Sequence, residues 1–158
     1  MNEIRVLVVS DSHGDVENMC AAVELTQPRM VLHLGDGWRD ADILTQRYPD
    51  LPLERVAGNC DYRGRENAER LLLIGGLRVL ICHGHTLGVK TDFSMLMRAA
   101  LERRADAVLF GHTHKPFVDI RNGVVMLNPG SIGDYARPTY GTLTVGDGKC
   151  IPATHVLK

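Results

Sequence analysis

Six short apolar runs recur along the 158-residue chain, and each one ends abruptly in polar residues. The runs are rich in Val, Leu and Ile, which is typical of strands buried on both faces of a sheet. A chain with several such strands must cover both faces of its sheets with other elements. The runs lie at residues 6–10, 30–34, 54–57, 78–82, 107–110 and 124–127.

Helical patterns separate several of these runs. Asp15 can cap the first helix, and Thr91 or Asp92 the last. Because strands and helices alternate early, the first half predicts parallel βαβ units. The expected helices cover residues 15–27, 39–48 (the weakest pattern) and 91–104.

The second half carries turn signals that join antiparallel strands. They are Gly75-Gly76, Asn122-Gly123 and Asp147-Gly148, of which the last two favour tight type I′ turns. The sequence therefore predicts an α/β fold with mixed sheets. At this length we expect residues 1–158 to form a single domain with a substantial core.

Composition limits the partners that the chain can have. The net charge is -1 and Lys and Arg form no run, which argues against a nucleic acid polymer or an anionic membrane as partner. Four widely spaced cysteines, without a C-x-x-C pair, indicate reduced thiols. No stretch of about 18 apolar residues occurs, and the first residues make a poor signal peptide, so we expect a cytoplasmic protein.

The polar residues at the strand ends form an ordered set of motifs: D-x-H at 11–13, G-D at 35–36, G-N-x-D at 58–61, H-G-H at 83–85 and G-H-T-H at 111–114. In open α/β sheets, ligands bind outside the carboxyl ends of the strands. Turn chemistry alone accounts for Asp, Asn and Gly at such positions. Histidine-rich turns are not ordinary, and His112 and His114 can both face one ion.

Taken together, these motifs resemble the signature of the calcineurin-like metallophosphoesterases, and most closely the compact prokaryotic phosphodiesterase branch, which is related to a scaffold subunit of retromer. The resemblance implies a four-layer α/β/β/α sandwich of two mixed sheets flanked by helices. It also implies two divalent metal ions. Asp11, His13, Asp36 and His114 would hold one ion, and Asp36, Asn59, His83 and His112 would hold the other.

The resemblance also implies that a carboxylate and a hydroxide bridge the two ions. Two cations about 4 Å apart repel each other, and negative groups between them offset this repulsion. The hydroxide would attack phosphorus. Imidazole, carboxylate and amide ligands suit Mn²⁺, Ni²⁺, Fe²⁺ or Zn²⁺; of these we favour Mn²⁺.

Three further residues are expected to take part in catalysis: Cys60, Asp61 and His85. Asp61 would orient the residue at position 60, and His85 would lie near the substrate or behind the ligands. Many family members have histidine where this chain has Cys60, so the usual group for protonating the leaving group is replaced.

The predicted function is hydrolysis of a small phosphodiester. A phosphomonoesterase of the same fold and a protein-interaction scaffold are the alternatives, and a homodimer is a further expectation. His33 and His155 lie in apolar strands and are expected to be core or surface residues.

Overall fold

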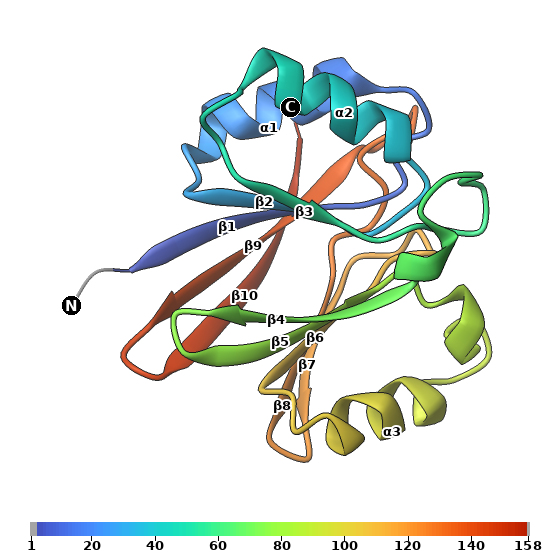
Figure 1. Ribbon diagram of the computed structural model, residues 1–158, viewed down its shortest axis with the longest axis vertical. Coiled ribbons are helices and arrows are strands. Elements are labelled where there is room, and N and C mark those ends of the chain that lie inside the picture. Colours follow the sequence, from blue (N-terminus) through green and yellow to red (C-terminus); the bar gives the residue numbers. More distant parts are fainter. Residues whose placement is uncertain (1–2, 158) are drawn as a thin grey trace.

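Two five-stranded sheets pack face to face, with helices on the outer faces (Figure 1). The computed structural model describes residues 3–157. The strand orders are β10-β9-β1-β2-β3 and β4-β5-β6-β8-β7. The elements are β1 (Ile4–Val9), α1 (Val16–Thr26), β2 (Met30–His33), α2 (Trp38–Arg47), β3 (Leu53–Arg55), β4 (Glu69–Ile74), β5 (Leu77–Cys82), α3 (Ser94–Glu102), β6 (Ala107–Leu109), β7 (Phe117–Arg121), β8 (Val124–Asn128), β9 (Thr139–Gly146) and β10 (Lys149–Val156).

Strand β1 shows why the apolar runs are continuous. Val6 and Val8 point into the core between the two sheets, whereas Leu7 and Val9 pack against the helices α1 and α2. Strands β5 and β6 likewise face the inter-sheet core on one side and α3 on the other. Both faces are buried, so no polar alternation is needed. The four-layer α/β/β/α sandwich is confirmed.

Each sheet combines parallel and antiparallel pairs. Strands β1, β2 and β3 run parallel, β9 pairs antiparallel with β1, and β10 pairs antiparallel with β9. In the second sheet β5, β6 and β8 run parallel, and β4 and β7 form the antiparallel edges. The predicted turns at 75–76, 122–123 and 147–148 join β4 to β5, β7 to β8 and β9 to β10.

Helix boundaries follow local capping. The Asp15 carboxylate accepts the Asn18 N–H at 3.0 Å, which confirms the predicted cap of α1. The predicted start of α3 at residue 91 was three residues too early, because the amides of Thr91 and Asp92 both donate to the Gly88 carbonyl in a turn. The strand predicted at 54–57 ends at Arg55.

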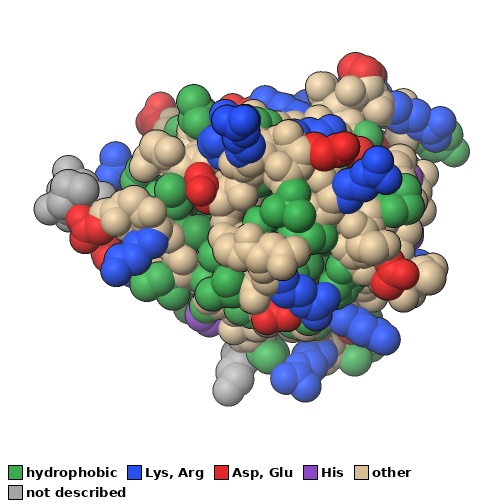
Figure 2. Space-filling view, turned by 90° about the horizontal axis from the view of Figure 1, so that it is seen from below, with side chains coloured by type: hydrophobic (Ala, Val, Ile, Leu, Met, Phe, Trp, Pro, Cys, Tyr) green, Lys and Arg blue, Asp and Glu red, His purple; other side chains and the backbone are tan. Residues whose placement is uncertain are grey.

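Nothing in residues 3–157 offers a helix with the length and apolar character that crossing a membrane would need. On the face that carries α3, seen in Figure 2, basic and acidic side chains are interspersed around apolar ones.

Candidate metal centre

The carboxyl ends of four parallel strands bring the predicted motifs to one edge of the sandwich. The Asp11 N–H donates to the Gly35 carbonyl at 2.9 Å, which joins the loops after β1 and β2. The Gly111 N–H donates to the His83 carbonyl at 3.0 Å and joins the loops after β5 and β6. Six of the predicted ligands meet there: Asp11, His13, Asp36, His83, His112 and His114.

Carboxylate oxygens and imidazole nitrogens converge at this edge. Asp11 Oδ1 lies 3.1 Å from His114 Nε2 and 3.7 Å from both His13 Nε2 and His83 Nε2. Asp36 Oδ2 lies 3.4 Å from His83 Nε2 and 3.9 Å from His13 Nε2. His112 Nδ1 is 3.2 Å from His83 Nε2. Atoms that bind one ion at about 2.1 Å and at right angles lie about 3 Å apart, so these separations fit metal ligands.

Each of the two central carboxylates has one oxygen held by the protein. Asp11 Oδ2 accepts the Ser10 hydroxyl at 2.6 Å and the His112 N–H at 3.2 Å. Asp36 Oδ1 accepts the Cys60 N–H at 2.8 Å. The other oxygen of each carboxylate faces the imidazoles. These contacts orient the carboxylates before any ion binds.

His83 is fully buried and has a defined tautomer. Its Nδ1 lies 2.8 Å from the Leu34 carbonyl, which can only accept, so Nδ1 carries a proton and, when the ring is neutral, Nε2 presents its lone pair to the centre. Burial lowers the pKa of His83, but the carboxylates of Asp36 and Asp11 more than offset it, and the net pKa is raised. The centre therefore favours a positive charge at this point, which a cation also supplies.

The pKa of Asp36 points the same way. Burial raises the pKa of Asp36, but the hydrogen bonds from His83 and from the Cys60 backbone lower it by more than burial raises it. The net pKa lies well below its usual value. Asp36 is therefore a carboxylate at neutral pH, as a ligand must be.

Five of the ligand candidates have a left-handed backbone, which residues other than glycine adopt uncommonly. Their φ angles are 54° at Asp11, 44° at His13, 59° at Asp36, 69° at His112 and 63° at His114. Such conformations cluster at functional sites, where the surrounding structure enforces them. This signal is invisible in the sequence, because only the fold reveals it.

Asp61 fixes the loop after β2. Its carboxylate accepts four backbone N–H groups, from Asp36 and Gly58 at 2.8 Å and from Gly37 and Trp38 at 3.1 Å. It thus holds Asp36 and the start of α2 in place, and contacts these amides rather than the side chain at position 60.

The remaining predicted residues lie at the rim. Asn59 and Cys60 are exposed, and the Asn59 amide nitrogen lies 3.6 Å from Cys60 Sγ. Burial and the neighbouring Asp36 raise the pKa of the Cys60 thiol. The ring of His85 lies 5.4 Å from that of His83. Its Nδ1 is the one buried side-chain nitrogen or oxygen atom of residues 3–157 that has no hydrogen-bond partner.

A hydrogen-bonded chain beneath the centre escaped the sequence reasoning. The Gly35 N–H donates to His33 Nδ1, so His33 Nε2 donates to Ser12 Oγ at 2.9 Å, and Ser12 Oγ donates to Asp40 Oδ2 at 2.6 Å. His33 is a core residue, and His155 is exposed on β10, as expected. Asp40 looked like an ordinary acidic residue in the first turn of a helix.

Two buried carboxylates and several imidazoles that present acceptor atoms to one space are the donor set of a divalent-metal centre. The architecture and the centre together define a metal-dependent hydrolase of the α/β sandwich class.

Comparison with known proteins specifies the family. Residues 4–148 match the calcineurin-like phosphoesterase superfamily domain. The probable metallophosphoesterase YsnB of Bacillus subtilis is 36% identical over 132 residues, which is 82% of this chain and 75% of that protein. The chain belongs to the calcineurin-like phosphoesterase superfamily, and it is a metal-dependent phosphoesterase.

Two solved structures share the fold at a TM-score of 0.74. One is described as a novel archaeal phosphodiesterase, with 24% identity over 98% of this chain and 100% of that one. The other is Vps29 of Entamoeba histolytica in complex with zinc, with 23% identity and the same coverage. The expected relationship to both prokaryotic phosphoesterases and the retromer subunit is confirmed at the level of fold.

Proposed function

We propose that the chain hydrolyses a small phosphodiester with two divalent ions bound at this centre. The acceptor atoms that surround the space between Asp11, Asp36 and His83 support the proposal most directly. The archaeal structural neighbour described as a phosphodiesterase favours a diester as substrate.

Two ligand sets share Asp36 in this proposal. One set comprises Asp11, His13, Asp36 and His114, and the other Asp36, Asn59, His83 and His112. The nitrogen and carboxylate ligands suit Mn²⁺, and no thiolate is involved. Ions held there would polarise the phosphoryl oxygens and supply an activated water at neutral pH.

The residues of the chain orient these groups. Ser10 and the Cys60 backbone hold the carboxylates of Asp11 and Asp36, and the Leu34 carbonyl fixes the tautomer of His83. Asp61 holds the loop that carries Asp36. Phosphoryl transfer depends mainly on such positioning and on charge stabilisation.

His85 and Cys60 are the groups next to the ligands that can meet the substrate. The His85 ring lies beside the ring of the proposed ligand His83, and its Nδ1 is buried without a hydrogen-bond partner. The raised pKa of the Cys60 thiol makes a thiolate nucleophile unfavourable. Cys60 therefore belongs to the rim of the site in this proposal, and not to the attacking group.

Metal analysis combined with two nitrophenyl substrates tests the function. We expect two Mn²⁺ per chain and faster hydrolysis of bis-p-nitrophenyl phosphate than of p-nitrophenyl phosphate. The reverse preference would establish the phosphomonoesterase alternative. Two bound ions without turnover of either compound would favour the scaffold, an alternative that the fold of Vps29 keeps open.

A further inference from the structure

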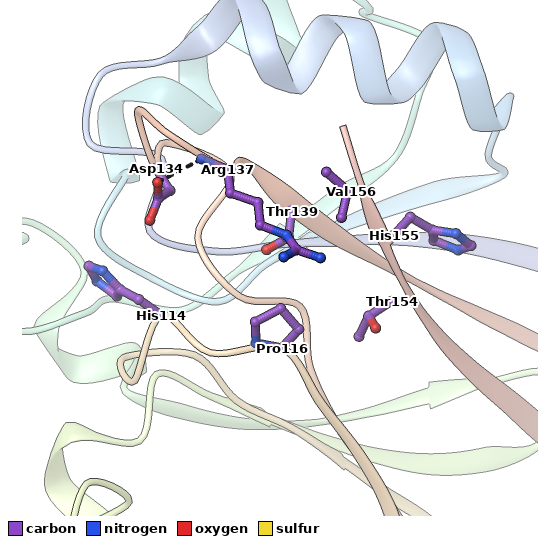
Figure 3. A pocket seen from close by; sticks show the side chains of 8 residues that line it. All are labelled: His114, Pro116, Asp134, Arg137, Thr139, Thr154, His155 and Val156. Carbon is purple, nitrogen blue, oxygen red and sulfur yellow. Dashed lines mark hydrogen bonds between the residues drawn. The ribbon is translucent and has the colours of Figure 1, made fainter. Parts of the chain in front are cut away.

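A hollow of about 480 Å³ opens directly beside His114, one of the proposed ligands. Figure 3 shows His114 on one side and His155 on the other, with the Arg137 side chain extending over the space between them. Pro116 and Val156 contribute apolar wall. The volume falls in the range of small-molecule sites and exceeds what one phosphate group requires.

The loop that carries Arg137 is fixed to the metal centre. The Ser131 hydroxyl and the Gly133 N–H both donate to the Asp11 carbonyl, at 2.8 and 3.2 Å. Asp134 Oδ1 accepts the N–H groups of Ala136 and Arg137 at 2.9 Å each. The backbone of Arg137 is therefore placed relative to the strand end that supplies Asp11.

The guanidinium of Arg137 is a suitable group for an anion. It is exposed, and it takes part in none of the ion pairs formed within residues 3–157. The neighbouring Asp134 already uses its Oδ1 to accept two backbone N–H groups. A planar guanidinium binds phosphate or carboxylate through two parallel hydrogen bonds.

We propose that this hollow binds an organic arm of the substrate and that Arg137 binds a second anionic group on that arm. The inference rests on the proposed phosphodiesterase function, because the scissile phosphate would lie at the centre beside His114. It narrows the substrate to phosphodiesters that carry a further negative charge. Simple diesters with neutral arms would leave Arg137 unused.

Two nitrophenyl diesters test the inference. Thymidine 5′-(4-nitrophenyl phosphate) has a neutral 3′ end, and its 3′-phosphorylated derivative carries the second anion; both release the same nitrophenolate. Arg137→Ala should lower kcat/KM for the 3′-phosphorylated ester about ten- to hundredfold, which is the strength of a charge-assisted hydrogen bond. The change should lie mainly in KM, because Arg137 would bind the second anion and not the reacting phosphate. The ester with the neutral end should change less than about threefold.

Arg98→Ala provides the matched control, because Arg98 lies on α3 with a side chain that is 79% exposed. It should alter neither ester, and Arg137→Lys should retain part of the preference. An equal effect of Arg137→Ala on both esters would overturn the inference and leave the phosphodiesterase function intact.

A binding measurement separates the two proposals. Thymidine 3′,5′-bisphosphate should shift the backbone amide resonances of Thr139 and Thr154 in the metal-free protein, and Arg137→Ala should abolish these shifts. If the metal-free protein shows these shifts but the Mn²⁺-loaded protein hydrolyses neither nitrophenyl ester, the anion site is retained and the phosphodiesterase function is rejected. Identical shifts in the two proteins would reject the anion site.

Discussion

The two ends of the sandwich use the same left-handed backbone for different purposes. At the hairpin end, Asn122 and Asp147 have φ angles of 52° and 54°, and each is followed by glycine. At the metal end, the left-handed positions include three histidines, His13, His112 and His114. Asn and Asp ease this conformation by local hydrogen bonds from their short side chains, whereas an L-residue without such bonds adopts it at a cost of roughly 1–2 kcal/mol.

This difference separates residues that serve the fold from residues that serve the candidate site. The hairpin end follows turn chemistry and connects antiparallel strands, so its residues serve the fold. The metal end accepts unfavourable backbone angles and places carboxylates near one another. We therefore expect changes at the metal end to affect metal and substrate binding more than changes at the hairpin end.

The largest expected contrast is between Asp36→Ala and Asp147→Ala, the same change at the two ends. Asp36→Ala should lower activity more than about a hundredfold, because even residues behind the ligands contribute 10- to 100-fold. It should also reduce the metal content to one ion or none. Inductively coupled plasma mass spectrometry and diester hydrolysis measure both. Equal metal loss in the two variants would refute the assignment of Asp36 as a shared ligand.

A second matched pair is Asp61→Asn and Asp147→Asn. The amide group of asparagine cannot accept the backbone N–H groups that one oxygen of Asp61 receives, so two buried donors lose their partner. We expect a loss of about 3 kcal/mol in the free energy of unfolding for Asp61→Asn. Asp147→Asn should change it by less than about 0.5 kcal/mol. Urea unfolding of the metal-free variants would show whether Asp61 organises the loop.

Most of the fold could be predicted from the sequence, because its signals are local. The apolar runs, the Asp15 cap and the glycine turns each depend on a few neighbouring residues. The addition of β9 and β10 beside β1, in the first sheet, could not be predicted. That pairing joins residues more than a hundred positions apart, and the turn at 147–148 says only that two strands meet.

The candidate site was predicted as a set of residue types rather than as a geometry. The motifs identified six residues that the structure brings together, but the contacts of Asp61 with four amides depend on how two loops pack. The chain from His33 through Ser12 to Asp40 joins two strand ends and a helix. Such contacts have no sequence spacing that would indicate them.

His33 makes the stability of the metal end dependent on pH. Burial lowers the pKa of His33 to about 4, below the ordinary value of about 6.5, so folding requires the neutral ring. The stabilising contribution is complete above about pH 6.5 and is lost as the pH falls toward 4. Between pH 7 and pH 5 the loss should be about 2 kcal/mol.

His33→Asn is the reference for this measurement, since its amide oxygen can still accept the Gly35 N–H but does not titrate. The difference in unfolding free energy between the two proteins should shrink on acidification, with the wild type losing more. Parallel pH curves would show that His33 does not titrate between these limits. His155→Asn, at an exposed ring, should leave the wild-type curve unchanged.

Cys60 belongs to the metal end but is exposed and lies at the rim. If an activated water attacks phosphorus, Cys60→Ser should change kcat/KM by less than about threefold. An inactive Cys60→Ser protein that still binds two ions would contradict this view. Cys60→His should raise activity on poor leaving groups and barely affect nitrophenyl esters, because general acid catalysis acts on groups that need a proton. Plots of log kcat/KM against leaving-group pKa distinguish the variants.

The smallest expected effect tests the comparison of the two ends directly. His13 Nε2 lies 3.7 Å from an Asp11 oxygen and 3.9 Å from an Asp36 oxygen, and both distances are too long for hydrogen bonds. In the metal-free protein, no side-chain hydrogen bond to these carboxylates therefore offsets the strain of the left-handed backbone at His13. His13→Gly should relieve about 1 kcal/mol of backbone strain and lose about 0.5 kcal/mol to the greater conformational freedom of the unfolded chain. Asp147→Gly has less strain to relieve, so it should be neutral or slightly destabilising.

The two glycine variants should therefore differ by about 0.5 kcal/mol in favour of His13→Gly, measured by urea unfolding of chelated protein at pH 8. With Mn²⁺ present the order should reverse, because the ion stabilises the native state of any protein that keeps its ligands. Equal stabilities in both conditions would mean that the strain at His13 is not connected with metal binding, and that the two ends differ in composition alone.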